Sequence, residues 1–188
     1  MTKAGRVARV LACVLLAAAA RQAPAQRGGH PPRRYTNPEY LFSVPLPQGV
    51  QVVTGRPPTP NHGVGLQVAT DAKAWAWAEY ETLDAETLPA EVESMRGIWA
   101  GNGCAVTGQR NGRLGGRAAV EVTFRCGPRG GRGQPDVMKL LLTMHTPPER
   151  GLVVYQVGVQ YKQGSPAAAR AERLYRELSA GFTFTTER

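Results

Sequence analysis

Apolar and polar residues alternate along most of the chain, as they do in strands that bury one face and expose the other. The clearest case in the first half is AWAWAEY, where Trp75 and Trp77 lie on one face and small alanines on the other. Pro45 stops the first β-like run, because proline has no amide hydrogen for a strand ladder. The pattern predicts four strands in this half, at 40–44, 51–54, 63–70 and 74–80.

Apolar residues then recur at helical spacing from Leu88 to Trp99. Pro89 sits in the first turn, where proline is tolerated, and Gly101 or Gly103 follows the last apolar residue. The pattern therefore predicts one amphipathic helix after the first group of strands.

Four strand-like segments follow this helix without interruption. The turn-rich sequence NGRLGG separates the first two, so they are expected to form a hairpin. The third and fourth segments are expected to pair and to form the centre of the sheet. The four segments are 104–110, 117–126, 137–146 and 151–162.

The end of the chain carries a second helix signal. Ser165 is a candidate N-cap, Pro166 follows at the first helical position, and Gly181 closes an apolar stripe. A short final strand is expected at 182–185. The order of strands, helix, strands, helix and strand indicates an α+β fold, an antiparallel β-sheet flanked by helices in a single domain.

The hairpin places two cysteines opposite each other. With the turn centred on Gly115, Cys104 faces Cys126 and Gly108 faces Val122, so the same register pairs the cysteines and keeps apolar residues on one face. We therefore predict a disulfide that closes a loop of about 23 residues and adds about 3 kcal/mol in the chain-entropy model. Two buried free thiols are the alternative.

The first 25 residues have the layout of a secretory signal peptide, with a basic start, an apolar run and the sequence Ala-Pro-Ala at 23–25. The apolar run is too short to span a bilayer, and most of it follows Cys13, which is the wrong order for a lipidation site. We expect a signal peptide at 1–25, a flexible lead-in at 26–34 and one domain at 35–186. The mature protein is then periplasmic or secreted, has no transmembrane helix, and comes from a bacterium.

Loss of the leader lowers the charge. The whole chain has 23 basic and 14 acidic residues, a net charge of +9. Four of the basic residues lie in the leader, so 19 basic and 14 acidic residues remain, a net charge of +5. This excess is too small to indicate a nucleic-acid partner by itself.

The stretch YTNPEYLFSVPLPQG at 35–49, the strand that holds Val153 and Tyr155, the proline-initiated helix and the terminal Gly-Phe-Thr-Phe together resemble the PsbP-like proteins. That fold is shared by PsbP of the photosystem oxygen-evolving complex, the Ran-binding Mog protein and DcrB-like periplasmic proteins. The resemblance covers nearly the whole mature chain. It implies an antiparallel sheet between helices and a non-enzymatic binding or assembly role, and it implies no particular functional residue.

Candidate catalytic and metal-binding residues are scattered. None of the four serines of the mature chain lies in a G-x-S-x-G setting, and His30, His62 and His145 have no metal-ligand spacing. Seven carboxylates between Asp71 and Glu93 lack the glycine-spaced pattern of a calcium loop, so a solvated surface explains them. We expect no catalytic residue, metal or cofactor.

The candidate binding residues are cationic or aromatic. Arg113, Arg129 and Arg132 lie in glycine-rich turns and suit an anionic envelope component or an acidic protein, although solvated hairpin loops explain them as well. Trp75 and Trp77 form either core or an exposed patch. The sequence thus predicts an exported binding or assembly factor without catalytic activity. A small envelope hydrolase and an anion-binding protein that uses the Arg-rich loops are the alternatives.

Overall fold

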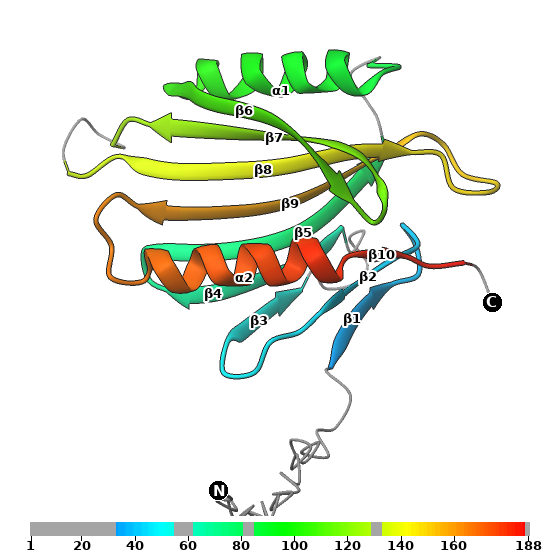
Figure 1. The fold of residues 1–188 in the computed structure, drawn as a ribbon, viewed down its shortest axis with the longest axis horizontal. Helices are drawn as coiled ribbons and strands as arrows, with labels where there is room; N and C mark the ends of the chain where they lie inside the picture. Colours follow the sequence, from blue (N-terminus) through cyan, green and yellow to red (C-terminus); the bar gives the residue numbers. More distant parts are fainter. Residues whose placement is uncertain (1–32, 55–61, 81–84, 129–132, 187–188) are drawn as a thin grey trace, which may run out of the picture. The chain divides into compact units, whose positions relative to one another are not determined.

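A computed structural model describes residues 33–54, 62–80, 85–128 and 133–186 of the chain. The expected signal peptide, nearly all of the expected lead-in, Arg129 and Arg132 lie outside these residues. The described part folds into ten strands and two helices (Figure 1). They are β1 Arg34–Asn37, β2 Phe42–Pro45, β3 Gln51–Thr54, β4 Gly63–Ala69, β5 Ala72–Tyr80, α1 Leu88–Gly101, β6 Cys104–Leu114, β7 Arg117–Cys126, β8 Asp136–His145, β9 Val153–Lys162, α2 Ala168–Gly181 and β10 Thr183–Phe184.

Most of the strands belong to one antiparallel sheet. Its strand order is β3-β4-β5-β9-β8-β7-β6, so β9 is the central strand and β8 pairs with it as expected. A small second sheet, β1-β2-β10, brings the start of the domain beside its last strand. This arrangement is the expected α+β fold with antiparallel pairing.

The large sheet changes its apolar face between β9 and β8. On β9 the odd positions, such as Tyr155 and Val157, are buried under α2. On β8 the even positions, such as Leu140 and Leu142, are buried on the opposite face, under α1. The register between β8 and β9 joins even to even positions, so the apolar positions of one strand cannot share a face with those of the other.

The two helices therefore cover diagonally opposite halves of the sheet. Helix α2 packs on β5 and β9 on one face, and α1 packs on β6, β7 and β8 on the other (Figure 1). Two half-faces remain open among the described elements. One is the α1 side of β3, β4 and β5, and the other is the α2 side of β6, β7 and β8.

The hairpin follows the expected register from Cys104 to Val106, which faces Phe124, but not beyond it. Cys104 lies opposite Cys126, and their sulfur atoms are bonded at 2.07 Å. A β-bulge after Val106 then shifts the register by one, so Gly108 faces Thr123 and not Val122. A bulge places two residues against one and moves all later side chains of the strand to the other face.

Three local expectations need correction. Ser165 is not the N-cap of α2, because the helix begins at Ala168 after Ala167, while Ser165 accepts the amide of Ala167 in the preceding turn. The strand expected at 40–44 starts only at Phe42, since Leu41 has a left-handed φ of 54°. Strand β1 takes in Arg34, which was assigned to the lead-in.

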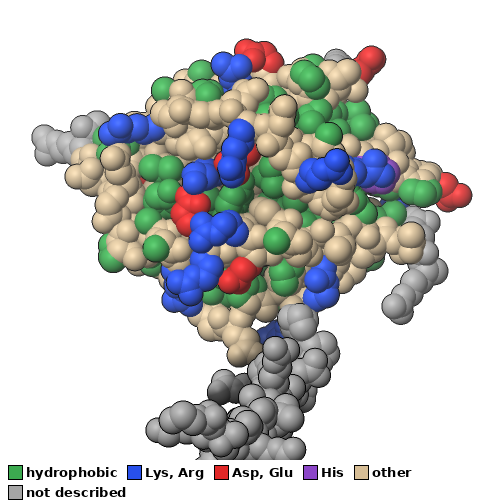
Figure 2. Space-filling view, viewed as in Figure 1, with side chains coloured by type: hydrophobic (Ala, Val, Ile, Leu, Met, Phe, Trp, Pro, Cys, Tyr) green, Lys and Arg blue, Asp and Glu red, His purple; other side chains and the backbone are tan. Residues whose placement is uncertain are grey.

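The two open half-faces differ in chemistry. Lys and Arg side chains, interspersed with Asp and Glu, gather across the face that carries α2 (Figure 2). The other open half-face carries the two tryptophans of β5. Within the described residues, neither helix has the length and apolar character needed to cross a membrane.

Candidate functional site

A groove of about 420 Å³ lies on the α1 side of β3, β4 and β5. Its lining is mainly apolar, and Val53 at its rim is 54% exposed. The groove exists because α1 covers only the far half of this face, while β4 contributes glycines to it. The main lining residues are Val53, Gly63, Gly65, Lys73, Trp75 and Trp77.

Trp75 lies between two glycines of neighbouring strands. In the sheet register Gly65 of β4 and Gly158 of β9 flank it on either side. A Cβ atom at Gly158 would lie 2.3 Å from two carbons of the indole, so the ring occupies the space that a side chain would need. At Gly65 a side chain could be accommodated, because a Cβ atom would make only an ordinary contact, 3.7 Å from the carbonyl oxygen of Val53. The indole thus packs over Gly158, and the groove lies on the side of the ring that faces Gly65.

Trp77 extends the aromatic wall and connects it to the core. Its indole stacks on the imidazole of His62 with a 5.0 Å centroid distance, and His62 stacks in turn on Tyr40 at 5.5 Å. The Nδ1 atom of His62 lies 3.0 Å from both the Tyr40 hydroxyl and the carbonyl oxygen of Ala78. Burial, together with the charge of nearby acids, raises the pKa of Tyr40 to about 12, so the hydroxyl stays protonated. These contacts fix the position of Trp77.

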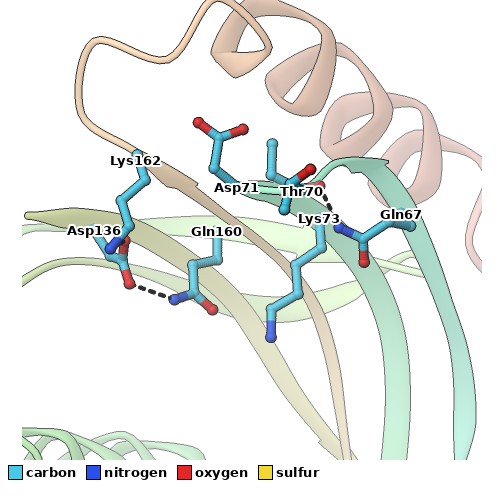
Figure 3. Close-up of a pocket in the computed structure, with 8 residues that line it drawn as sticks. Gln67, Thr70, Asp71, Lys73, Asp136, Gln160 and Lys162 are labelled. Carbon is cyan, nitrogen blue, oxygen red and sulfur yellow. Dashed lines mark hydrogen bonds and ion pairs between the residues drawn. The ribbon is translucent and has the colours of Figure 1, made fainter. Parts of the chain in front are cut away.

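A polar hollow continues the groove at the β4–β5 turn (Figure 3). Gln67 and Lys73 line both parts. Deeper in the polar hollow, Asp136 pairs with Lys162 at 2.7 Å and accepts a hydrogen bond of 2.9 Å from Gln160. The carboxylate of Asp136 is therefore already neutralised by Lys162 and hydrogen-bonded by Gln160.

Lys73 stands at the junction of the apolar and polar parts. Its neighbours across the sheet are Gln67 and Gln160, and its ammonium lies 5.6 Å from the centre of the Trp75 ring. The side chains of Lys73 and Asp71 point in opposite directions (Figure 3). Among the described residues no carboxylate forms an ion pair with Lys73, so its ammonium is available to a ligand that lies on Trp75.

The described histidines are not arranged for catalysis. His62 contacts the groups named above, and the Nε2 atom of His145 lies 3.2 Å from the guanidinium of Arg117. Burial and the charge of Arg117 lower the pKa of His145. Glu86 and His145 line one shallow hollow, but no hydrogen bond joins them there. The described residues therefore contain no histidine paired with a carboxylate or with a nucleophile.

Of the seven carboxylates between Asp71 and Glu93, Glu81 and Asp84 lie outside the described residues, and the described ones form no cluster. Glu93 forms an exposed ion pair with Arg96 at 2.9 Å, and Asp71 lies at the turn between β4 and β5. No three His, Cys, Asp or Glu side chains of the described segments come close enough together to hold a metal ion.

Of the arginines singled out from the sequence, Arg113 is described. It lies near the end of β6, where its guanidinium donates to the carbonyl oxygen of Gly116 at 2.9 Å. The chain leaves β7 toward Arg129 at Cys126, roughly 30 Å along the strand from the turn that Arg113 contacts.

The groove could be predicted only in part from the sequence. The alternation of AWAWAEY places both tryptophans on one face. The sequence signal that points to the groove is Gly65, which lies opposite Trp75 on the neighbouring strand and places no side chain beside the ring. Gly63 has a different cause, because a Cβ atom there would clash with the backbone of Ala76 and Trp77. Lys73 lies two residues before Trp75 on the same strand, so alternation places both side chains on one face.

A domain with a large and a small antiparallel sheet, and with two helices on diagonally opposite halves of the large one, belongs to the α+β class of folds. The comparisons with solved structures give this class a name. No protein-family model matches the chain, and no curated protein sequence is similar to it. The fold is the PsbP-like fold.

Three solved structures support this assignment. LpqN, involved in cell envelope biogenesis of Mycobacterium tuberculosis, is 17% identical with a TM-score of 0.57, and the match covers 84% of this chain and 87% of LpqN. The Ran-binding protein Mog1p of Saccharomyces cerevisiae is 11% identical with a TM-score of 0.55, covering 84% and 97%. Cyanobacterial PsbP of Synechocystis is 13% identical with a TM-score of 0.53, covering 87% and 98%. At these identities the likeness shows the fold alone.

Proposed function

We propose that this chain is an exported, non-catalytic binding protein of the cell envelope, and that it holds an amphipathic ligand in the groove beside Trp75 and Trp77. The observation that carries the proposal is the composition of this groove. An apolar wall that neither helix covers continues into a polar hollow, and an ammonium without an acidic partner among the described residues stands between the two. Ligand sites are usually concave, mostly apolar and equipped with a few polar groups that orient the ligand.

The ligand that fits this arrangement has an apolar body and an anionic or hydrogen-bond-accepting head. The body lies along the two indoles and Val53, and the head accepts a hydrogen bond from the ammonium of Lys73, because the amide group of Gln67 already donates to the carbonyl oxygens of Ala69 and Ala72. The involvement of LpqN in cell envelope biogenesis, the Ran binding of Mog1p and the disulfide of this chain support the proposal of an exported binding protein. The leader predicted at 1–25 supports export and can be tested by mass spectrometry of the secreted or periplasmic protein, which should begin near Gln26.

Decanoate is a suitable probe because it joins an apolar chain to one carboxylate. We expect it to change the tryptophan fluorescence of the protein and to bind more tightly than decylamine, whose positive head repels Lys73. Gly65→Leu should abolish this binding, since a side chain at this open position fills the groove. A result in which decanoate and decylamine bind equally, or in which Gly65→Leu binds as the wild type does, contradicts the proposal.

Strand β3 offers a matched control. Val52 and Val53 are adjacent, both are exposed, and they lie on opposite faces of the strand. Val53→Asp places a carboxylate at the groove rim and should weaken the binding of decanoate. Val52→Asp makes the same chemical change on the other face and should leave the binding unchanged.

A further inference from the structure

The large sheet ends in two edge strands of different character, β3 and β6. An edge strand presents unpaired N–H and C=O groups, and proteins usually protect such an edge with charged side chains, bulges or proline. Strand β6 has two of these protections. A bulge follows Val106, and Arg110 and Arg113 place a charge on each face, because residues three apart in a strand point to opposite faces.

Strand β3 has neither protection. Its four residues, Gln51 to Thr54, include no charged residue and no proline, and its register with β4 is regular. All four are exposed, with Val52 at 40% and Val53 at 54%. Valine and threonine favour the extended backbone of a strand. The edge therefore has the side chains of a paired strand and nothing that keeps another strand away.

The outer backbone groups of β3 are also available. In an antiparallel pair, every second residue directs its N–H and C=O toward the partner, and the residues between direct theirs away from it. Of the segments that the structure describes, β4 is the one that forms backbone hydrogen bonds with β3. The outward N–H and C=O groups can thus bind a ligand with the same repeat of donors and acceptors, which an extended polypeptide provides.

The length of β3 favours a short segment of a partner protein over a second copy of this chain. A stable interface between two folded proteins engages about 20–30 residues on each side, and β3 has four. A short segment paired with β3 also meets a valine on each face, since residues directly opposite each other in a ladder share a face. The residue opposite Val53 lies at the rim of the groove, which Val53 lines.

We propose that β3 is a strand-addition site, which binds an extended, uncharged segment of a partner protein rich in β-branched residues. The main chain of the segment pairs with the outer edge of β3, and Val52 and Val53 select its side chains. This function goes beyond the amphipathic ligand of the groove, because it depends on the backbone of β3 and on both of its faces.

A synthetic peptide tests the proposal without a variant of the protein. The probe is Thr-Val-Thr-Val-Thr with blocked ends and a fluorescent label, and its binding to the purified protein is followed by fluorescence anisotropy. The same peptide with every amide nitrogen methylated keeps the side chains and loses the hydrogen-bond donors. We expect the first peptide to bind and the methylated one not to bind.

Three substitutions locate the contact. Val52→Asp and Val53→Asp should each weaken peptide binding about fivefold, the effect of losing one favourable cross-strand pair. Val106→Asp is the matched control, because Val106 is an exposed valine on the protected edge strand, and it should leave peptide binding unchanged. The midpoint of urea unfolding checks that each variant is folded. Val52→Asp should weaken the binding of the peptide and not that of decanoate, so failure at the edge is distinguishable from failure at the groove.

Amide hydrogen exchange, measured residue by residue, identifies the hydrogen bonds. In the free protein every second amide of β3 should exchange rapidly, and the peptide should slow the exchange of these amides at least tenfold. Any of three results overturns the proposal: the unmethylated peptide does not bind, the methylated peptide binds equally well, or the bound peptide leaves the exchange of β3 unchanged. Slow exchange of all β3 amides in the free protein also overturns it, since another part of the chain or a second copy then covers the edge.

Discussion

The packing of the Trp75 ring over Gly158 gives a prediction about the free energy of unfolding. In Gly158→Ala the added Cβ atom would lie 2.3 Å from the Cε2 and Cζ2 atoms of the indole and 2.8 Å from Nε1. Contacts this short do not persist, so the ring must leave its place or the strands must move apart. We expect the ring to move into the groove, since the sheet is hydrogen-bonded on both sides of Gly158.

The size of the effect follows from two opposing contributions. Forcing an extra carbon into an occupied site typically costs 1–3 kcal/mol. Replacing glycine by alanine inside a strand recovers roughly 0.5–1 kcal/mol of backbone entropy. The free energy of unfolding should therefore fall by about 1–2 kcal/mol. For a domain of this length, that shifts the unfolding temperature downward by roughly 2–8 °C.

Gly65→Ala is the matched control. Gly65 also lies opposite Trp75 in the register, but a Cβ atom there meets only ordinary contacts, the nearest at 3.7 Å. Urea unfolding followed by circular dichroism should show a lower midpoint for Gly158→Ala and an unchanged or higher one for Gly65→Ala. Trp75→Ala should remove most of the cost of Gly158→Ala in a double-mutant cycle. Equal midpoints for the two alanine variants, or additive effects in the cycle, would refute the packing of Trp75 described here.

Three further predictions concern the rest of the domain. Replacing both Cys104 and Cys126 by alanine should lower the free energy of unfolding by about 3 kcal/mol in urea titrations, and reduction of the wild type should match it. Tyr175→Phe removes a donor to the Glu121 carboxylate and should cost about 1.5–3 kcal/mol in the same assay. Because the pKa of His145 is lowered from 6.5 in the fold, its neutral form is favoured there, so the protein should lose stability as the pH falls below about 6.5. His145→Gln should flatten that part of the stability–pH curve, and an unchanged curve would contradict this.

Much of the fold could be predicted from the chain because periodicity and turn residues act locally. Strand β7 and strand β3 have the expected bounds, and α1 runs from Leu88 to Gly101 as its apolar spacing indicates. The errors occur where one residue changes the geometry. Leu41 delays β2 through a left-handed backbone, and no glycine marks that position. The bulge after Val106 shifts the hairpin register, and Gly108 beside it is a weak local signal because glycine within a strand has several possible causes.

The candidate sites were harder to predict because they depend on which strands lie side by side. Alternation places Trp75 and Trp77 on one face, but their exposure is decided by the position of α1, which is on the other half of the sheet. Glu121 is the one acid within the arginine-rich stretch of the sequence, yet only the fold shows that it binds Arg110 and Tyr175. The hollow of about 440 Å³ beside Glu121 is lined by residues of β6 and of α2, more than 60 positions apart, so this proximity has no local signal.

The open half-faces follow from the change of apolar face between β8 and β9. Since Leu140 and Leu142 point away from α2 and Tyr155 points toward it, a single helix layer on one side cannot bury both strands. One helix is needed on each face, and each covers only the half where the sheet is apolar. The uncovered halves must then be compatible with water, either by charge, as around Glu121, or by the absence of a side chain, as at Gly65. The first solution leaves the guanidinium of Arg110 fixed by Glu121, and the second leaves a groove beside the aromatic rings of Trp75 and Trp77, so two chemically different open surfaces follow from one packing constraint.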